Sequence, residues 1–547
     1  MNASPQDGHN RVSRRKFLWG ATALFAGCTA PALRTQSPEI LEEELDRVKL
    51  VRHFSVPFGV HPLKIESAGL VLGLPGTGGD PPPGTERAMI LEEMKKRSVE
   101  NPNQLLADSS TAVVLVSGYL PPGCQKGDRF DVDVWVPPTS ETASLRGGRL
   151  LETRLRELTQ QRGRIHEGHL MGKAGGPILV DPMAESDDSA TLLRRGRILG
   201  GGICLKARPL GLALTPGSKS VPASSQIGKV INQRFSTYIK GRKVGVATPK
   251  TDGYVELIVH PRYKDNVGRY LQVLRAIAIQ ETPTQRLERM KVLADQLHDP
   301  ITAAAAALGL EAIGKEGIET LKTGIQTDDT EIRFYACEAL AYLDETSAAV
   351  PLGHIALAEP AFRAAAMAAL SAMDDPLARD ELVQLLDNNS AETRYGAFRA
   401  LTMMNDRDPL VRGERLNDFT YHIITTTNEP LVHVTRGYRP EVVQFGERVW
   451  LSTPLTLEPS HNLLITSASE GNLKLIKFLA GQENEERFVS SKLDDVVRGI
   501  TDLGFGYPEV VNMLAQARQA KALNCRLEFD ALPDASRRYE RPPAEES

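Results

Sequence analysis

The pattern of apolar and polar residues changes character twice along the chain. From Ser37 to about Ile279 it indicates short strands separated by glycine and proline. Phe130, Val132 and Val134 alternate with polar residues, as in a half-buried strand. Helical spacing also occurs in this part, at 88–97, 225–235 and 267–278. This mixture predicts an α+β fold, without the regular alternation of a doubly wound sheet.

The middle of the chain, from about Thr284 to Arg412, is rich in alanine and predicts helices only. Arginines recur there at intervals of 30 and 31 residues, at Arg333, Arg363 and Arg394. Alanine follows each arginine at +3 and leucine at +7, which places all three positions on one helical face. A helix pair repeated at a fixed period is typical of an α-solenoid, and this one resembles a short HEAT-like array of three to four units. An irregular alanine-rich bundle is the alternative.

Strands return after Leu416, with predicted strands at Arg448–Leu457, Ser460–Ser467 and Arg526–Phe529. A helical stretch lies before the last of these, at Leu493–Leu523. The tail from residue 531 contains proline and glutamate, and we predict that it is disordered.

The first 28 residues have the pattern of an export signal. Arg14 and Arg15 precede a short apolar run, as in a twin-arginine signal, and the run ends in a lipobox-like Ala26-Gly27-Cys28. This predicts that Cys28 becomes the lipidated first residue of an envelope protein. A cleaved signal without lipid and a buried N-terminal helix are the alternatives.

Composition excludes several classes of protein. The 547 residues carry 65 Lys+Arg and 69 Asp+Glu, so no excess of positive charge draws the whole chain to nucleic acid. Five cysteines are too few for a disulfide scaffold, and no C-x-x-C pair is present. Export would place Cys124, Cys204, Cys337 and Cys525 in an oxidising compartment. Their pairing stays open, although Cys337 lies on the helical stripe and is predicted to be a buried thiol.

No catalytic or metal motif emerges from the sequence. The loop Gly76–Asp80 is not followed by the lysine of a phosphate-binding loop. His166 and His169 are three residues apart in a predicted strand, where their side chains point to opposite faces. There is no G-x-S-x-G segment. We therefore expect no enzyme activity, no cofactor and no metal.

Several motifs in one order carry a family resemblance. Gly69–Asp80 is similar to G-L-V-x-G-L-x-G-T-G-D, and Ser144–Leu151 to S-L-R-G-G-x-L-L. Segments at Val113–Gly127 and Leu493–Phe529 follow the same family order. Together they resemble the bacterial flagellar basal-body P-ring protein family. The residues that carry this motif, with a structural role expected for each, are Gly73, Gly76, Thr77, Gly78, Asp80, Arg146, Gly147 and Gly148.

This resemblance implies two mixed α/β halves interrupted by the helical repeats. The predicted divisions are an export signal at 1–28, a linker at 29–47, P-ring-like regions at 48–283 and 414–530, the array at 284–413 and the tail at 531–547. Because repeat contacts are local, we expect the array to be separable from the halves.

The resemblance also implies a function. Copies of the chain would form a ring, or bushing, around the flagellar rod in the periplasm and peptidoglycan layer. Its partners would be other copies, the rod, the L ring and peptidoglycan. The alternative is a lipid-anchored periplasmic scaffold that reuses the fold, with the array as a surface for a protein partner.

The N-terminal pattern makes a testable prediction. Mass spectrometry of the native protein should find an acylated N-terminal peptide that begins at Cys28. Replacing Arg14 and Arg15 with lysine should leave the precursor in the cytoplasm, because twin-arginine export requires the arginine pair. A mature protein that still contains residues 1–27 would contradict the prediction.

Overall fold

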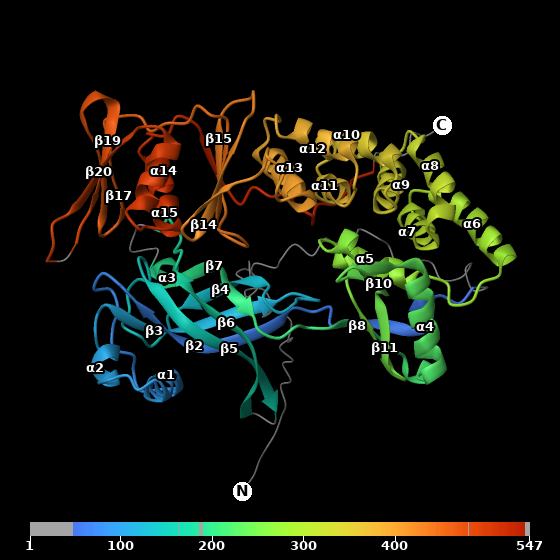
Figure 1. Ribbon diagram of the computed structural model, residues 1–547, viewed down its shortest axis with the longest axis horizontal. Helices are drawn as coiled ribbons and strands as arrows, with labels where there is room; N and C mark the ends of the chain where they lie inside the picture. Colours follow the sequence, from blue (N-terminus) through green and yellow to red (C-terminus); the bar gives the residue numbers. More distant parts are fainter. Residues whose placement is uncertain (1–47, 162–163, 185–189, 480, 542–547) are drawn as a thin grey trace, which may run out of the picture.

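The computed structural model describes residues 48–161, 164–184, 190–479 and 481–541. The predicted export signal, with Arg14, Arg15 and Cys28, and the linker lie outside the described residues. Within these ranges the fold is mixed α and β, as predicted. Figure 1 shows four bodies, described below in turn, although residues 55–58 of the second body precede the first body in sequence.

The first body is a closed six-stranded barrel. Its strands, in spatial order, are β2 (Leu63–Leu72), β3 (Thr111–Leu120), β4 (Arg129–Trp135), β7 (Arg195–Cys204), β6 (Arg164–Pro177) and β5 (Arg149–Gln161). Phe130, Val132 and Val134 of β4 are buried and the residues between them are more exposed, as their alternation predicts. Helices α1 (Thr85–Lys96) and α2 (Pro102–Leu106) pack on the outside of β2 and β3, and α3 (Ala190–Leu193) precedes β7.

The second body, called here the small body, is built on a four-stranded antiparallel sheet. Its strands are β1 (Ser55–Phe58), β8 (Leu210–Leu214), β12 (Tyr254–Leu257) and β11 (Ala247–Thr251). A hairpin of β9 (Ser236–Ile239) and β10 (Arg242–Gly245) lies beside it, with helices α4 (Val221–Arg234) and α5 (Val267–Arg275). Ser220 begins α4 with a side-chain N-cap, and Asn266 does the same for α5.

The third body, the helical array, consists of eight helices. They are α6 (Pro283–Leu297), α7 (Ala303–Ile313), α8 (Ile318–Ile325), α9 (Thr330–Tyr342), α10 (Ala349–Ala358), α11 (Arg363–Ser371), α12 (Pro376–Leu385) and α13 (Ala391–Met404). Helices α7, α9, α11 and α13 contact one another in sequence, and α10 contacts α12 beside them. The stripe residues Leu340, Leu370 and Leu401 are all buried.

The repeated arginine has a local structural role. Arg333 Nε donates to the carbonyl of Thr327 at 3.1 Å, and Arg363 Nε donates to that of Ala356 at 2.8 Å. Arg394 donates in the same way to the carbonyl of Asn388. In each repeat, therefore, a charged donor satisfies a carbonyl at or just beyond the end of the preceding helix, where intrahelical partners are lacking.

The fourth body, the C-terminal layer, contains two sheets with two helices between them. One sheet is β13 (Glu414–Leu416), β14 (Phe419–Ile424), β16 (Glu441–Phe445), β15 (Leu431–Val434) and β21 (Arg526–Phe529). The other is β17 (Thr456–Ser460), β18 (Leu463–Ser467), β19 (Asn472–Lys477) and β20 (Glu485–Ser490). Helices α14 (Leu493–Asp502) and α15 (Tyr507–Gln519) share one core with both sheets. In Figure 1 this layer lies above the barrel, although the array separates the two in sequence.

Two sequence predictions in the C-terminal part were wrong. The strand predicted at Arg448–Leu457 is reduced to isolated bridges at Trp450 and Leu451, with β17 starting only at Thr456. The tail was predicted to be disordered, but its residues 531–541 pack against the array. Its composition suggested disorder, but the array supplies carboxylates and an aromatic ring that hold it.

The array and the small body share one hydrophobic core and a buried ion cluster. Arg269 of α5 donates to Glu311 of α7 at 2.5 and 3.0 Å and pairs with Glu338 of α9 at 2.5 Å. Tyr263 also donates to Glu311, at 2.6 Å. Arg269 is only 2% exposed, and Glu311 is fully buried. The expected separability of the array does not fit this arrangement, because deleting the array would leave a buried guanidinium without either carboxylate.

Replacing Arg269 tests this cluster. Arg269→Met should lower the free energy of unfolding by about 3–5 kcal/mol, since it leaves buried carboxylates unpaired. Urea unfolding followed by circular dichroism would measure the loss. Arg498→Met, which removes a surface arginine paired with Glu414 and Asp494, is the control and should cost less than about 1 kcal/mol.

The same variant should show a dependence on pH. Burial raises the pKa of Glu338 above its usual value. The folded state therefore holds this proton more tightly than the unfolded chain. That contribution to stability is complete below the usual carboxyl pKa, about 4.3, and is lost as pH rises through the raised value. Without Arg269 the pKa should rise further, so the variant should be less destabilised at pH 5 than at pH 8. Equal losses at both pH values would contradict this account.

Candidate functional site

The motif residues lie in two loops at one end of the barrel, and a third loop packs against them. The loop after β2 holds Gly73 to Asp80, the turn before β3 holds Ser109 and Ser110, and the loop before β5 holds Arg146 to Gly148. Backbone hydrogen bonds join them, with Leu74 N donating to Ser110 O at 3.0 Å and Gly78 N to Ser109 O at 2.8 Å. The motif is therefore one packed cluster.

Thr77 connects the first loop to the third. Its hydroxyl donates to the carbonyl of Ser144 at 2.8 Å, and its own carbonyl accepts from Ala143 N at 2.8 Å. Each of these bonds satisfies a backbone group in the loops. Thr77 thus links two segments of backbone, and its hydroxyl is used as a hydrogen-bond donor to Ser144 and not as an exposed nucleophile.

The motif glycines are required for two different reasons. Gly73, Gly76 and Gly147 have φ values of +80°, +75° and +79°, which residues with a side chain rarely adopt. Gly78 and Gly148 are required by space instead. A Cβ on Gly78 would lie 2.6 Å from Ser109 O, and one on Gly148 would lie 2.6 Å from Val71 Cγ1.

The two charged motif residues hold neighbouring segments. Asp80 pairs with Arg87 of α1 at 2.6 Å. Arg146 donates to the carbonyls of Asp181 and Ala184 at 3.2 and 3.1 Å, which fixes the segment after β6. Both side chains have structural partners, although the Nε of Arg146 is buried without a hydrogen-bond partner among the described residues.

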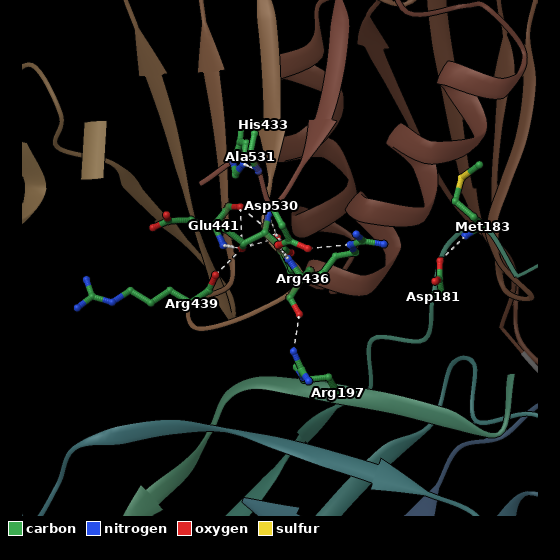
Figure 2. A network of polar contacts seen from close by, with 11 residues as sticks. Asp181, Met183, Arg197, His433, Arg436, Arg439, Glu441, Asp530 and Ala531 are labelled. Atoms are coloured by element: carbon green, nitrogen blue, oxygen red, sulfur yellow. Dashed lines mark hydrogen bonds and ion pairs between the residues drawn. The ribbon is translucent and has the colours of Figure 1, made fainter. Parts of the chain in front are cut away.

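The barrel meets the C-terminal layer close to these loops. Leu179 and Leu199 from the barrel belong to the core of the C-terminal layer. Arg197 of β7 pairs with Asp133 at 2.7 Å and donates to the carbonyl of Arg436 at 3.5 Å. Figure 2 shows Arg197 pointing from the barrel toward Arg436.

The loop between β15 and β16 forms the other side of this junction. Asp131 of β4 accepts hydrogen bonds from Gly200 N at 2.8 Å and from Tyr438 N. Burial raises the pKa of the Asp131 carboxyl. Arg436 also binds Asp530 at the end of β21, with Nε and Oδ2 2.9 Å apart (Figure 2). Polar contacts thus join the barrel to the C-terminal layer, and no motif in the sequence marks them.

Burial and packing set the environment of one histidine and three cysteines. Burial lowers the pKa of His433 to about 3, and its ring stacks on Tyr395 with centroids 3.5 Å apart. Cys337 is fully buried, and burial raises its pKa to about 12. Cys124 and Cys204 share a hydrogen bond between sulfurs 3.6 Å apart and are not joined in a disulfide.

The described residues contain no cluster of metal ligands and no membrane-spanning helix. No group of three or more His, Cys, Asp or Glu side chains there could hold a metal ion. His166 and His169 both belong to β6. No helix in the described part is long and apolar enough to cross a membrane.

Comparison with known proteins gives a family match over the first two bodies. Residues 55–293 match the family described as flagellar P-ring protein, a family of structural proteins. The flagellar P-ring protein of Nitrosospira multiformis is 28% identical over 207 residues, which are 35% of this chain and 52% of that protein. That of Methylobacillus flagellatus is 31% identical over 205 residues, with 35% and 54% covered.

A further relative is matched over a larger share of its length. The flagellar P-ring protein of Thermotoga maritima is 24% identical over 251 residues, which are 44% of this chain and 69% of that protein. The chain spans about half to three fifths of the length of the first relatives it matches. The resemblance found in the sequence is therefore supported over residues 55–293, which comprise the barrel, the small body and the start of the array.

The motif cluster generates a prediction about packing. Gly78→Ala should lower the free energy of unfolding by about 3 kcal/mol, because its Cβ would overlap the carbonyls of Ser109 and Thr111. Gly217→Ala is the matched control, since a Cβ there meets nothing within 4 Å. Thermal unfolding of both variants would compare them. Equal midpoints would show that the cluster is not tightly packed.

Proposed function

We propose that this chain is a structural subunit of a P-ring-like assembly that surrounds the flagellar rod in the periplasm. The observation that carries the proposal is the family match over residues 55–293. The motif cluster supports a mechanical role, because its glycines and polar side chains are used in packing. In this proposal no residue performs chemistry, and the assembly acts by enclosing the rod.

Ring closure requires a head-to-tail interface that repeats around an axis. The small body offers surfaces suited to such contacts. Strand β1 is an edge of its sheet and exposes Val56 and Phe58, which are 49% and 55% accessible. Strand β9 exposes Tyr238 at 71%. Exposed apolar side chains on sheet edges favour pairing with another chain.

The other partners and the location belong to the same proposal. Arg14 and Arg15 would direct export, and lipidated Cys28 would hold the assembly on a membrane. The L ring, the rod and peptidoglycan would contact the ring. The regions 48–283 and 414–530 would build its body, with 284–413 as a HEAT-like solenoid that carries a further protein contact.

A second candidate is a lipid-anchored periplasmic scaffold that reuses the fold. The observation that favours it is the array, most of which lies beyond the family match. Repeat arrays of this kind commonly present extended binding surfaces. In this case the chain would remain monomeric and would bind its partner through the array.

The two candidate functions predict different masses for the particle that the chain forms in solution. The exported protein, purified in detergent, should form closed rings in negative-stain images and scatter light as many copies of the mature chain. Phe58→Asp should lower that mass, since a charge on the edge of β1 opposes pairing. Leu287→Asp on α6, an exposed position outside the small body, is the control and should leave the mass unchanged. A wild-type monomer at all concentrations would contradict the ring and favour the scaffold.

A further inference from the structure

Residues 531–541 form an extended segment that lies along the helical array. Side chains alternate in exposure over residues 534–540, and Arg541 after them is exposed. Arg537 and Tyr539 are half-buried, whereas Arg538 and Glu540 are exposed. This period of two is the pattern of an extended peptide with one face on a surface.

Two ion pairs hold the ends of this contact. Arg537 reaches Glu392 of α13 with both terminal nitrogens, at 2.7 and 2.8 Å. Arg541 reaches Glu331 of α9 at 2.5 and 3.1 Å, and it also donates to the carbonyl of Pro300. Two-point pairing between guanidinium and carboxylate is the strong and directional form of this interaction.

An aromatic contact lies between the two ion pairs. Tyr539 stacks on Phe362, which is the residue before α11, with ring centroids 4.8 Å apart. Phe362 in turn stacks on Phe334 of α9 at 4.2 Å. Near the start of the segment, Pro533 approaches Gly396 so closely that a Cβ there would lie 2.5 Å from its Cγ. The segment therefore lies in a fitted position across three helices.

The contacting groups come from equivalent positions of the repeat. Glu331 and Glu392 each stand two residues before the repeated arginine, in the first and third of the repeats that carry it. Phe362 stands one residue before that arginine in the repeat between them. The array thus places carboxylate, aromatic ring and carboxylate in a row at the starts of the alternate helices α9, α11 and α13.

We propose that this row is a binding site for an extended peptide with arginines four residues apart and a tyrosine midway between them. The chain's own tail fills the site within the same molecule. A partner that presents Arg-x-Tyr-x-Arg must displace the tail in order to bind. This inference does not depend on ring assembly, because it uses contacts within one chain.

A labelled peptide tests the site on the full-length protein. The peptide has the sequence of residues 531–541 and carries fluorescein, and binding is followed by fluorescence anisotropy. The full chain with Arg537→Glu and Arg541→Glu should have an open site and bind the peptide saturably. The wild-type chain should bind at least tenfold more weakly, because its own tail competes.

Variant peptides separate a specific site from general attraction of charge. Peptides with Arg537→Glu or Arg541→Glu should bind the opened chain at least tenfold more weakly than the native peptide. The peptide with Arg538→Glu makes the same change of charge on the outward face, and its affinity should fall less than threefold. Adding Glu392→Gln to the opened chain should weaken the native peptide as well.

Two results would overturn the proposal. One is equal peptide binding by the wild-type and opened chains, which would mean that the tail does not fill the site. The other is an equal loss of affinity for the opened chain in the Arg537→Glu and Arg538→Glu peptides. The opened chain should unfold in the same temperature range as the wild-type chain when followed by circular dichroism. This control verifies that the opened chain is folded.

Discussion

The buried pairing of Arg269 with Glu311 and Glu338 determines how the rest of the molecule is arranged. A guanidinium that is 2% exposed needs its carboxylates, so the small body and the array have to pack together. At the far end of the array, Tyr395 of α13 donates to Glu441 of β16 at 2.6 Å. The array is therefore bound to the small body at one end and to the C-terminal layer at the other. It brings the C-terminal layer into contact with the barrel.

This arrangement gives the motif cluster its context. At the end of the barrel close to the C-terminal layer, several glycines occupy conformations or spaces that exclude a side chain. Thr77 and Arg146 link the neighbouring backbone segments there by hydrogen bonds. Such a packed junction fits the structural role that we propose for the chain. The match of residues 55–293 to the flagellar P-ring family agrees with that interpretation.

The parts that sequence predicted are those governed by local periodicity. The alternation of Phe130, Val132 and Val134 predicted β4, and the recurring leucines predicted the buried stripe of the array. Contacts between distant residues had no such signal. Asp131 resembled an ordinary outward residue of a half-buried strand, and Arg269 resembled a surface charge on α5. The tail was misjudged because its order comes from Glu331, Phe362 and Glu392, which lie 145 to 210 residues before their partners in the tail.

Electron cryotomography of flagellar basal bodies would test the proposed role in the cell. Averaged basal bodies from cells that lack this chain should have no ring density around the rod at the level of peptidoglycan, and expressing the wild-type chain should restore it. A ring of unchanged shape and occupancy in cells without the chain would contradict the account.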